Sequence, residues 1–125
     1  MKTLLLLIIA FLSTATLAQS QPPSSPLHVN CMIQEFVNSQ LAKETGVSID
    51  SSSQHHGAMI FPKLSVISEV DMMIALHEGL LIVSLYHNPS GISSASHSDI
   101  TGGKNAHSQI NLGDGRSVTV NCLKD

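Results

Sequence analysis

The chain has 125 residues, of which 42% are hydrophobic and only 3% aromatic, and its formal net charge is −3 with the histidines neutral. This length predicts one small domain with a single core and little stability to spare. The mild negative charge excludes the basic surfaces that bind nucleic acid or anionic membranes. The scarcity of aromatic residues argues against a site that stacks the bases of single-stranded nucleic acid.

Residues 1–18 have the pattern of a secretory signal peptide, with an early lysine, an apolar run over 4–12 and small residues before a cleavage site after Ala18. The apolar run is shorter than the roughly 20 residues that a membrane helix needs. We therefore expect an exported protein, in the periplasm or outside the cell, without membrane insertion. Residues 19–26 predict a disordered Pro/Ser linker, and residues 27–125 a single β domain.

The two cysteines, Cys31 and Cys122, lie near opposite ends of the expected mature chain. An even number of cysteines in an exported protein predicts a disulfide. Closing a loop of this length contributes roughly 4 kcal/mol to stability in the chain-entropy model. A thiol nucleophile or half of a metal site is the alternative, and an oxidising compartment disfavours it.

From Leu27 to Ile33 apolar and polar residues alternate, which is typical of a β-strand. Asn38 and Ser39 predict a turn into a second strand that reaches Ile49. Apolar residues also recur at helical spacing over residues 31–45, so a helix is an open alternative there. We adopt the hairpin.

The longest apolar run of the mature chain covers residues 70–86. It predicts a central hairpin, with one strand ending near Leu76, a tight turn, and a second strand from Leu80 to Tyr86. Because the residues of the second strand are mostly branched and apolar, we expect it to be buried on both faces. The remaining strands should pack around this pair.

The segments before and after the central hairpin are shorter. Residues 51–57 predict a polar loop, and residues 58–61 a short strand ended by Pro62. Residues 63–68 form another alternating stretch. After a turn at residues 88–91 we expect a long loop over 92–106, and then a hairpin of residues 108–112 and 116–123 around an Asp-Gly turn. The pattern as a whole predicts an all-β fold: a small antiparallel β-sandwich, or a barrel, of about seven to eight strands, with the first and last strands joined by the disulfide.

Seven histidines are the one unusual count, and five of them lie in predicted turns or loops: His55, His56, His87, His97 and His107. If these loops converge, three or four imidazoles would suffice to hold zinc or copper. No pair of histidines has a diagnostic metal-binding spacing. Exposed histidines that serve solubility are the plainer interpretation.

Serines 93, 94, 96 and 98 lie close in sequence to His97 and Asp99, which supplies the residue types of a hydrolase triad. A triad is defined by its three-dimensional geometry, so proximity in sequence carries little weight. The Gly-x-Ser-x-Gly pattern is absent.

Our leading hypothesis is a non-enzymatic exported module, without a cofactor, that binds a protein or cell-envelope partner or has a structural role. Residues 91–107 are the segment to watch, because function concentrates in long ordered loops on rigid scaffolds. The second hypothesis is a metal-binding protein that uses the loop histidines. The third is a small hydrolase.

Overall fold

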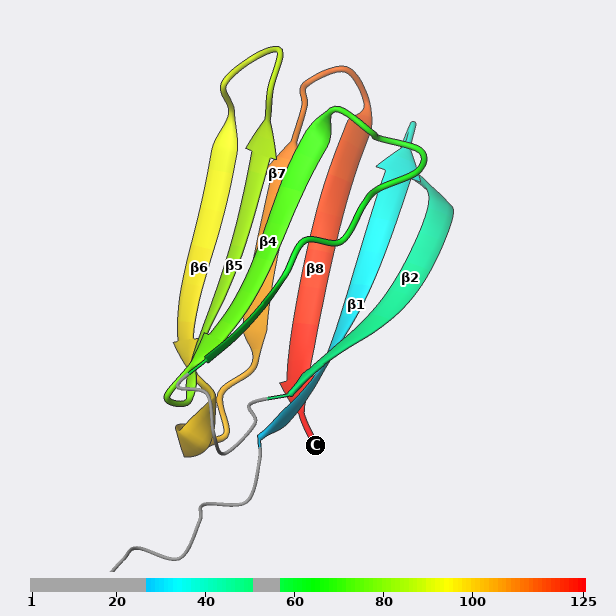
Figure 1. Cartoon of the computed structure of the whole chain (residues 1–125). Helices are drawn as coiled ribbons and strands as arrows, with labels where there is room; N and C mark the ends of the chain where they lie inside the picture. The colour runs from blue at the N-terminus through cyan, green and yellow to red at the C-terminus, as the bar shows by residue number, and fades with distance from the viewer. Residues whose placement is uncertain (1–26, 51–56) are drawn as a thin grey trace, which may run out of the picture.

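The computed structural model describes residues 27–50 and 57–125 (Figure 1). The predicted signal peptide, the predicted linker and most of the predicted polar loop lie outside these residues. The described part of the chain contains eight β-strands and one short 3₁₀ helix: β1 His28–Val37, β2 Gln40–Asp50, β3 Gly57–Ile60, β4 Val70–His77, β5 Leu80–His87, β6 Ser93–Asp99, η1 Ile100–Gly102, β7 Ala106–Asn111 and β8 Arg116–Lys124.

The strands form two antiparallel sheets of four strands each that pack face to face (Figure 1). The first sheet has the order β2-β1-β8-β7, and the second has the order β3-β4-β5-β6. Apolar residues at alternate positions of both sheets form one core, in which Ile33, Val120, Ile74 and Val83 are almost completely buried. The all-β antiparallel sandwich expected from the sequence is confirmed.

The first hairpin is β1–β2, and the helical alternative for residues 31–45 is excluded. The two-residue turn places Asn38 and Ser39 at positive φ, 50° and 63°. Turns of this hand match the twist of the strands they join, and asparagine tolerates the left-handed conformation better than most residues. The predicted turn is therefore correct.

The central hairpin β4–β5 turns at Glu78 and Gly79, as expected. Gly79 has a φ of 82°, and a Cβ at this position would lie 2.3 Å from Cγ2 of Thr101. Its carbonyl oxygen accepts a hydrogen bond from the Ile100 N–H at 3.0 Å. Glycine is thus required both by the turn and by the close packing of η1 against it.

The expectation that β5 is buried on both faces is wrong. Leu81, Val83 and Leu85 are buried in the core, but Leu80 and Tyr86, on the opposite face, are 39% and 43% exposed. In the described part of the chain the first sheet covers the second on one side only. The central hairpin therefore has more apolar surface than it buries in the core of the sandwich.

Two further segments differ from expectation. Residues 63–68 are not a strand; they form an irregular connection that buries Leu64 and Ile67. Residues 92–106 are not a long loop, since β6, η1 and the first residue of β7 occupy most of them. Pairing with β5 outweighs the weak strand propensity of the serine-rich β6 sequence, as tertiary context commonly does.

The predicted disulfide joins Cys31 of β1 to Cys122 of β8, with an S–S distance of 2.02 Å. The two cysteines lie directly opposite each other in the β1–β8 register, so the bond connects the first and last strands. Among the described residues, no helix is long and apolar enough to cross a membrane.

Candidate functional site

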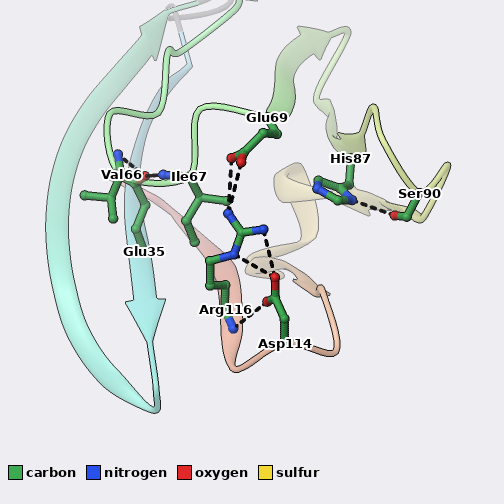
Figure 2. Close-up of polar contacts among 8 residues, drawn as sticks. All are labelled: Glu35, Val66, Ile67, Glu69, His87, Ser90, Asp114 and Arg116. Atoms are coloured by element: carbon green, nitrogen blue, oxygen red, sulfur yellow. Dashed lines mark hydrogen bonds and ion pairs between the residues drawn. The ribbon is translucent and has the colours of Figure 1, made fainter.

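At one end of the sandwich, Glu35 of β1 holds the irregular connection against the first sheet (Figure 2). Its side chain is 1% exposed, and its Oε1 accepts the backbone N–H groups of Val66 and Ile67 at 2.8 and 2.7 Å. These bonds satisfy two backbone donors that have no strand partner. This buried acid therefore has a structural role.

Beside it, Arg116 joins the two sheets (Figure 2). Its guanidinium contacts the carboxylate of Glu69, which precedes β4, at 3.1 Å, and that of Asp114 in the β7–β8 turn at 2.8 Å. The pKa of Asp114 is lowered, chiefly by its hydrogen bond with Arg116. The pKa of Glu69 is lowered by a hydrogen bond with its own backbone and then by Arg116. The paired carboxylates are thereby stabilised in their charged form.

The histidines proposed as metal ligands do not gather in the described part of the chain. His87 is 7% exposed, and its Nδ1 lies 2.6 Å from Oγ of Ser90 (Figure 2). His97 lies on β6 in the second sheet, and His107 on β7 in the first sheet, where it hydrogen-bonds Asn121. Within residues 27–50 and 57–125, no three His, Cys, Asp or Glu side chains are close enough to hold a metal ion.

His55 and His56 lie outside the described residues, so the metal hypothesis now depends on them. The hydrolase hypothesis meets a different obstacle. Serines 94, 96 and 98 are half-buried, whereas His97 and Asp99 are exposed on the opposite face of β6. The Asp99 carboxylate accepts hydrogen bonds from Thr101 and caps η1, and these bonds lower its pKa. Strand alternation thus separates these three serines from the histidine and the acid. Ser93 shares the exposed face with His97 but lies four residues before it along an extended strand, about 13 Å away.

The four edges of the two sheets are not equally protected. The β6 and β7 edges face each other, and Ser94 Oγ lies 3.0 Å from Ser108 Oγ between them. At the other side of the sandwich, β3 has only four residues. By contrast, β2 has eleven residues, most of them exposed, and no described strand pairs with it on the side away from β1. We call this side the free edge of β2; it lies at the rim of the sandwich in Figure 1.

The register identifies which backbone groups point to the free edge. The Asp125 N–H donates to the His28 carbonyl, and the Asn38 N–H donates to the Gly115 carbonyl, so even-numbered residues of β1 direct their backbone groups to β8. Odd-numbered residues of β1 therefore face β2 and its odd-numbered partners. It follows that Glu44, Gly46 and Ser48 direct their N–H and C=O groups to the free edge.

A mostly apolar hollow of about 330 Å³ adjoins this edge on the outer face of the first sheet. Its lining includes Gly46 and Ser48 of β2, Asn30 and Met32 of β1, and Asn121 and Leu123 of β8. The register places Gly46 opposite Met32, and a Cβ built on Gly46 would meet no atom within 4 Å. We call this feature the Gly46 hollow. A glycine inside a strand weakens it and often marks a place where another backbone or a ligand approaches.

Carboxylates flank the Gly46 hollow along β2. Glu44 accepts a hydrogen bond from Gln34 at 2.7 Å, and Asp50 lies 2.5 Å from His28 Nδ1. The one basic side chain of β2, Lys43, hydrogen-bonds Ser65 at 2.7 Å and belongs to the core-facing set of residues. The outer side of the free edge is therefore acidic at both ends.

Comparisons of this chain with protein-family models, with characterised proteins and with solved structures gave no match. The candidate site thus rests on geometry. The sequence alone does not predict the free edge of β2 or a role for Gly46. The available signal was a glycine within an alternating run that is followed by Val47 and Ile49.

Proposed function

We propose that this chain is an exported, non-enzymatic binding module that recognises a protein partner by adding one of its strands to the free edge of β2. Export is supported by the signal-peptide pattern of residues 1–18 and by a disulfide, which persists mainly in oxidising compartments. The partner would be another exported protein or a component of the cell envelope.

One observation carries this proposal: the longest strand of the described fold has an unpaired edge. Natural β-proteins usually shorten, cover or bend such edges, because a row of unpaired N–H and C=O groups pairs readily with another chain. Here β2 runs for eleven residues while the other edges are short or face each other. Main-chain hydrogen bonds along such an edge supply affinity, and adjacent pockets supply specificity.

A displayed library of random short peptides, selected on the purified oxidised chain, tests the proposal. We expect enrichment of sequences that bind the native chain and fail to bind Ser48→Pro. Proline removes a backbone N–H that points to the free edge, and proline is tolerated on edge strands where the N–H faces solvent. Ser48→Ala is the matched control, because it also loses the hydroxyl that bonds Asn30 but keeps the N–H.

Enrichment on the native chain and on Ser48→Ala, with loss on Ser48→Pro, supports strand addition. Equal binding to all three forms, or no enrichment, overturns it. Circular dichroism and thermal melts of both variants confirm that the fold is retained. If residues 1–26 of the chain itself occupy the edge, removing them will be required before any peptide binds, and that outcome also overturns a role in partner binding.

A further inference from the structure

We infer that the free edge of β2 selects an extended segment with one large apolar residue between two basic residues, running antiparallel to β2. This inference rests on the proposed function and names the partner chemistry at that site. Numbering the partner segment from its N-terminus, basic side chains occupy the first and seventh positions and a large aliphatic side chain occupies the fifth.

The positions follow from the alternation of β2. Residues of an added antiparallel strand that lie opposite Asp50, Ser48, Gly46 and Glu44 are its first, third, fifth and seventh. Their side chains share the outer face with those of β2, because opposite residues in a sheet point the same way. The same residues direct their backbone groups to β2, so each can exchange hydrogen bonds with its partner.

The Gly46 hollow sets the fifth position. Gly46 has no side chain, so a partner side chain opposite it can extend across β2 towards Met32 and Leu123. A mostly apolar hollow of about 330 Å³ is at the small end of the range for ligand pockets, about 300–1,000 Å³, and suits one leucine-sized or larger group. Burying that group would also cover Met32, which is 40% exposed.

Charge sets the first and seventh positions. Asp50, which contacts His28 Nδ1, and Glu44, which accepts a hydrogen bond from neutral Gln34, place one carboxylate near each end of the hollow. The nearest basic side chain of β2, Lys43, is engaged with Ser65. Opposite charges that face each other across a strand pair stabilise it, and like charges destabilise it. Basic residues at both ends of the segment are therefore favoured over acidic ones.

A second copy of β2 does not meet these requirements. Along the stretch beside the hollow, β2 presents Glu44, Gly46, Ser48 and Asp50 on the outer face, and none of these residues has a side chain that can fill an apolar hollow. Pairing β2 with itself would also bring acidic residues of the two copies to the same edge. The occupant we infer is therefore a segment of a different protein.

The test uses the acetylated and amidated peptide Lys-Val-Thr-Val-Leu-Thr-Lys and follows its binding by amide chemical shifts of the isotope-labelled oxidised chain. N-methylation of the leucine blocks a donor that should face β2, and N-methylation of the valine before it blocks one that should face solvent. We expect the first change to weaken binding by about tenfold or more, and the second to leave it nearly unchanged. Shifts should be concentrated at Glu44, Gly46 and Ser48.

Side-chain selection is tested on both partners. Gly46→Val fills the hollow where the structure leaves room for a side chain, and it should weaken the leucine peptide by about tenfold while Gly46→Ala has a smaller effect. Exchanging the leucine for serine, or both lysines for glutamate, should weaken binding to the native chain. The reversed sequence should bind more weakly than the forward one.

The outcomes distinguish this inference from the proposed function. Library peptides that need the Ser48 N–H but lack the apolar and basic positions, or that bind Gly46→Val normally, overturn the inference and leave strand addition standing. Equal affinity for the forward and reversed peptides overturns the antiparallel orientation. Equal sensitivity to the two N-methyl peptides, or no binding by any peptide, overturns both.

Discussion

Single residues hold together the end of the sandwich where β1 turns into β2. The carboxyl group of Glu35 supplies the acceptor for two backbone N–H groups of the connection that leads into β4. An acidic residue that is only 1% exposed is uncommon in so small a core. The cost of removing its polar side chain from water is offset only while both backbone donors remain bonded to it.

Replacing this acid should reveal how much it contributes. Glu35→Ala leaves the N–H groups of Val66 and Ile67 without their acceptor, and we expect a loss of about 3 kcal/mol in the free energy of unfolding. Glu35→Gln keeps an oxygen acceptor and should lose less than half as much. Urea denaturation measures both. Equal losses in the two variants would mean that the side-chain oxygen is not what matters.

The Arg116 network predicts a dependence of stability on pH. The pKa values of Glu69 and Asp114 are lowered in the folded chain, so the folded state binds fewer protons than the unfolded state in mild acid. The resulting stabilisation is complete above the unfolded pKa values, which are near 4, and is lost as the pH falls through the lower folded values. The wild type should therefore lose stability in acid partly through these two groups.

The variant Arg116→Met tests whether the stabilisation from these ion pairs is lost in acid, as the lowered pKa values predict. The difference in unfolding free energy between wild type and variant should be greatest at about pH 6 and should shrink towards about pH 3. Lys124→Met, which removes a positive charge from the other end of β8, is the control and should show little such convergence. A wild-type advantage over Arg116→Met that stays constant across this range would contradict the role assigned to the ion pairs.

At the scale of elements, the two faces of β5 should respond differently to a threonine substitution. Val83→Thr puts a hydroxyl into the core at a fully buried position and should cost about 2 kcal/mol. Ile82→Thr lies on the half-buried outer face and should cost less than half of that. Thermal or urea melts measure both variants. Equal costs would contradict the one-sided burial of this strand.

The disulfide also acts at the scale of elements, because it joins the first strand to the last. Cys31 and Cys122 are separated by 91 residues in sequence, so the bond removes much of the conformational freedom of the unfolded chain. The double variant Cys31→Ala/Cys122→Ala should lose roughly 4 kcal/mol, which is a large share of the stability of a domain this small. A change of less than about 1 kcal/mol would show that the rest of the fold keeps the ends together without it.

The sequence predicts strands correctly where an alternating apolar pattern is next to residues that favour a tight turn. The β1–β2 and β4–β5 hairpins have both signals, at Asn38-Ser39 and at Glu78-Gly79. The strand β6 has neither strong apolar alternation nor β-branched residues, and it becomes a strand through its pairing with β5. The sequence does predict the turn at residues 88–91 that joins these two neighbouring strands. The serine-rich segment after that turn lacks strand propensity of its own, so the sequence predicts a loop over residues 92–106.

The candidate site was less accessible to prediction. The even-numbered positions of β2 become a site only when β1 pairs with one side of the strand and no described strand pairs with the other. Side chains gave no indication of it, since the site is made mainly of backbone groups and of the missing side chain of Gly46. The sequence shows that β5 is apolar at most positions. It does not show that only one face of β5 is buried.

At the scale of the whole molecule, the two lateral sides of the sandwich differ in how their strand edges are covered. Along the β6–β7 side the sheets meet, with Ser94 and Ser108 in contact. Along the opposite side the connection before β4 contacts Lys43 of β2 through Ser65, and no described strand pairs with the outer edge of β2. The disulfide ties β1 to β8, and Arg116 ties β8 to the residue that precedes β4. Because β2 is already a formed strand, its edge binds an extended segment with little ordering cost of its own.

Amide hydrogen exchange along β2 tests this most directly. In the oxidised chain alone, the N–H groups of Thr45 and Val47 should be protected, and those of Glu44, Gly46 and Ser48 should exchange rapidly, because only the odd-numbered residues face β1. Adding the lysine-flanked leucine peptide should protect the even-numbered set as well. Uniform protection before any peptide is added, or no gain in protection at these three amides when the peptide is bound, would contradict strand addition at β2.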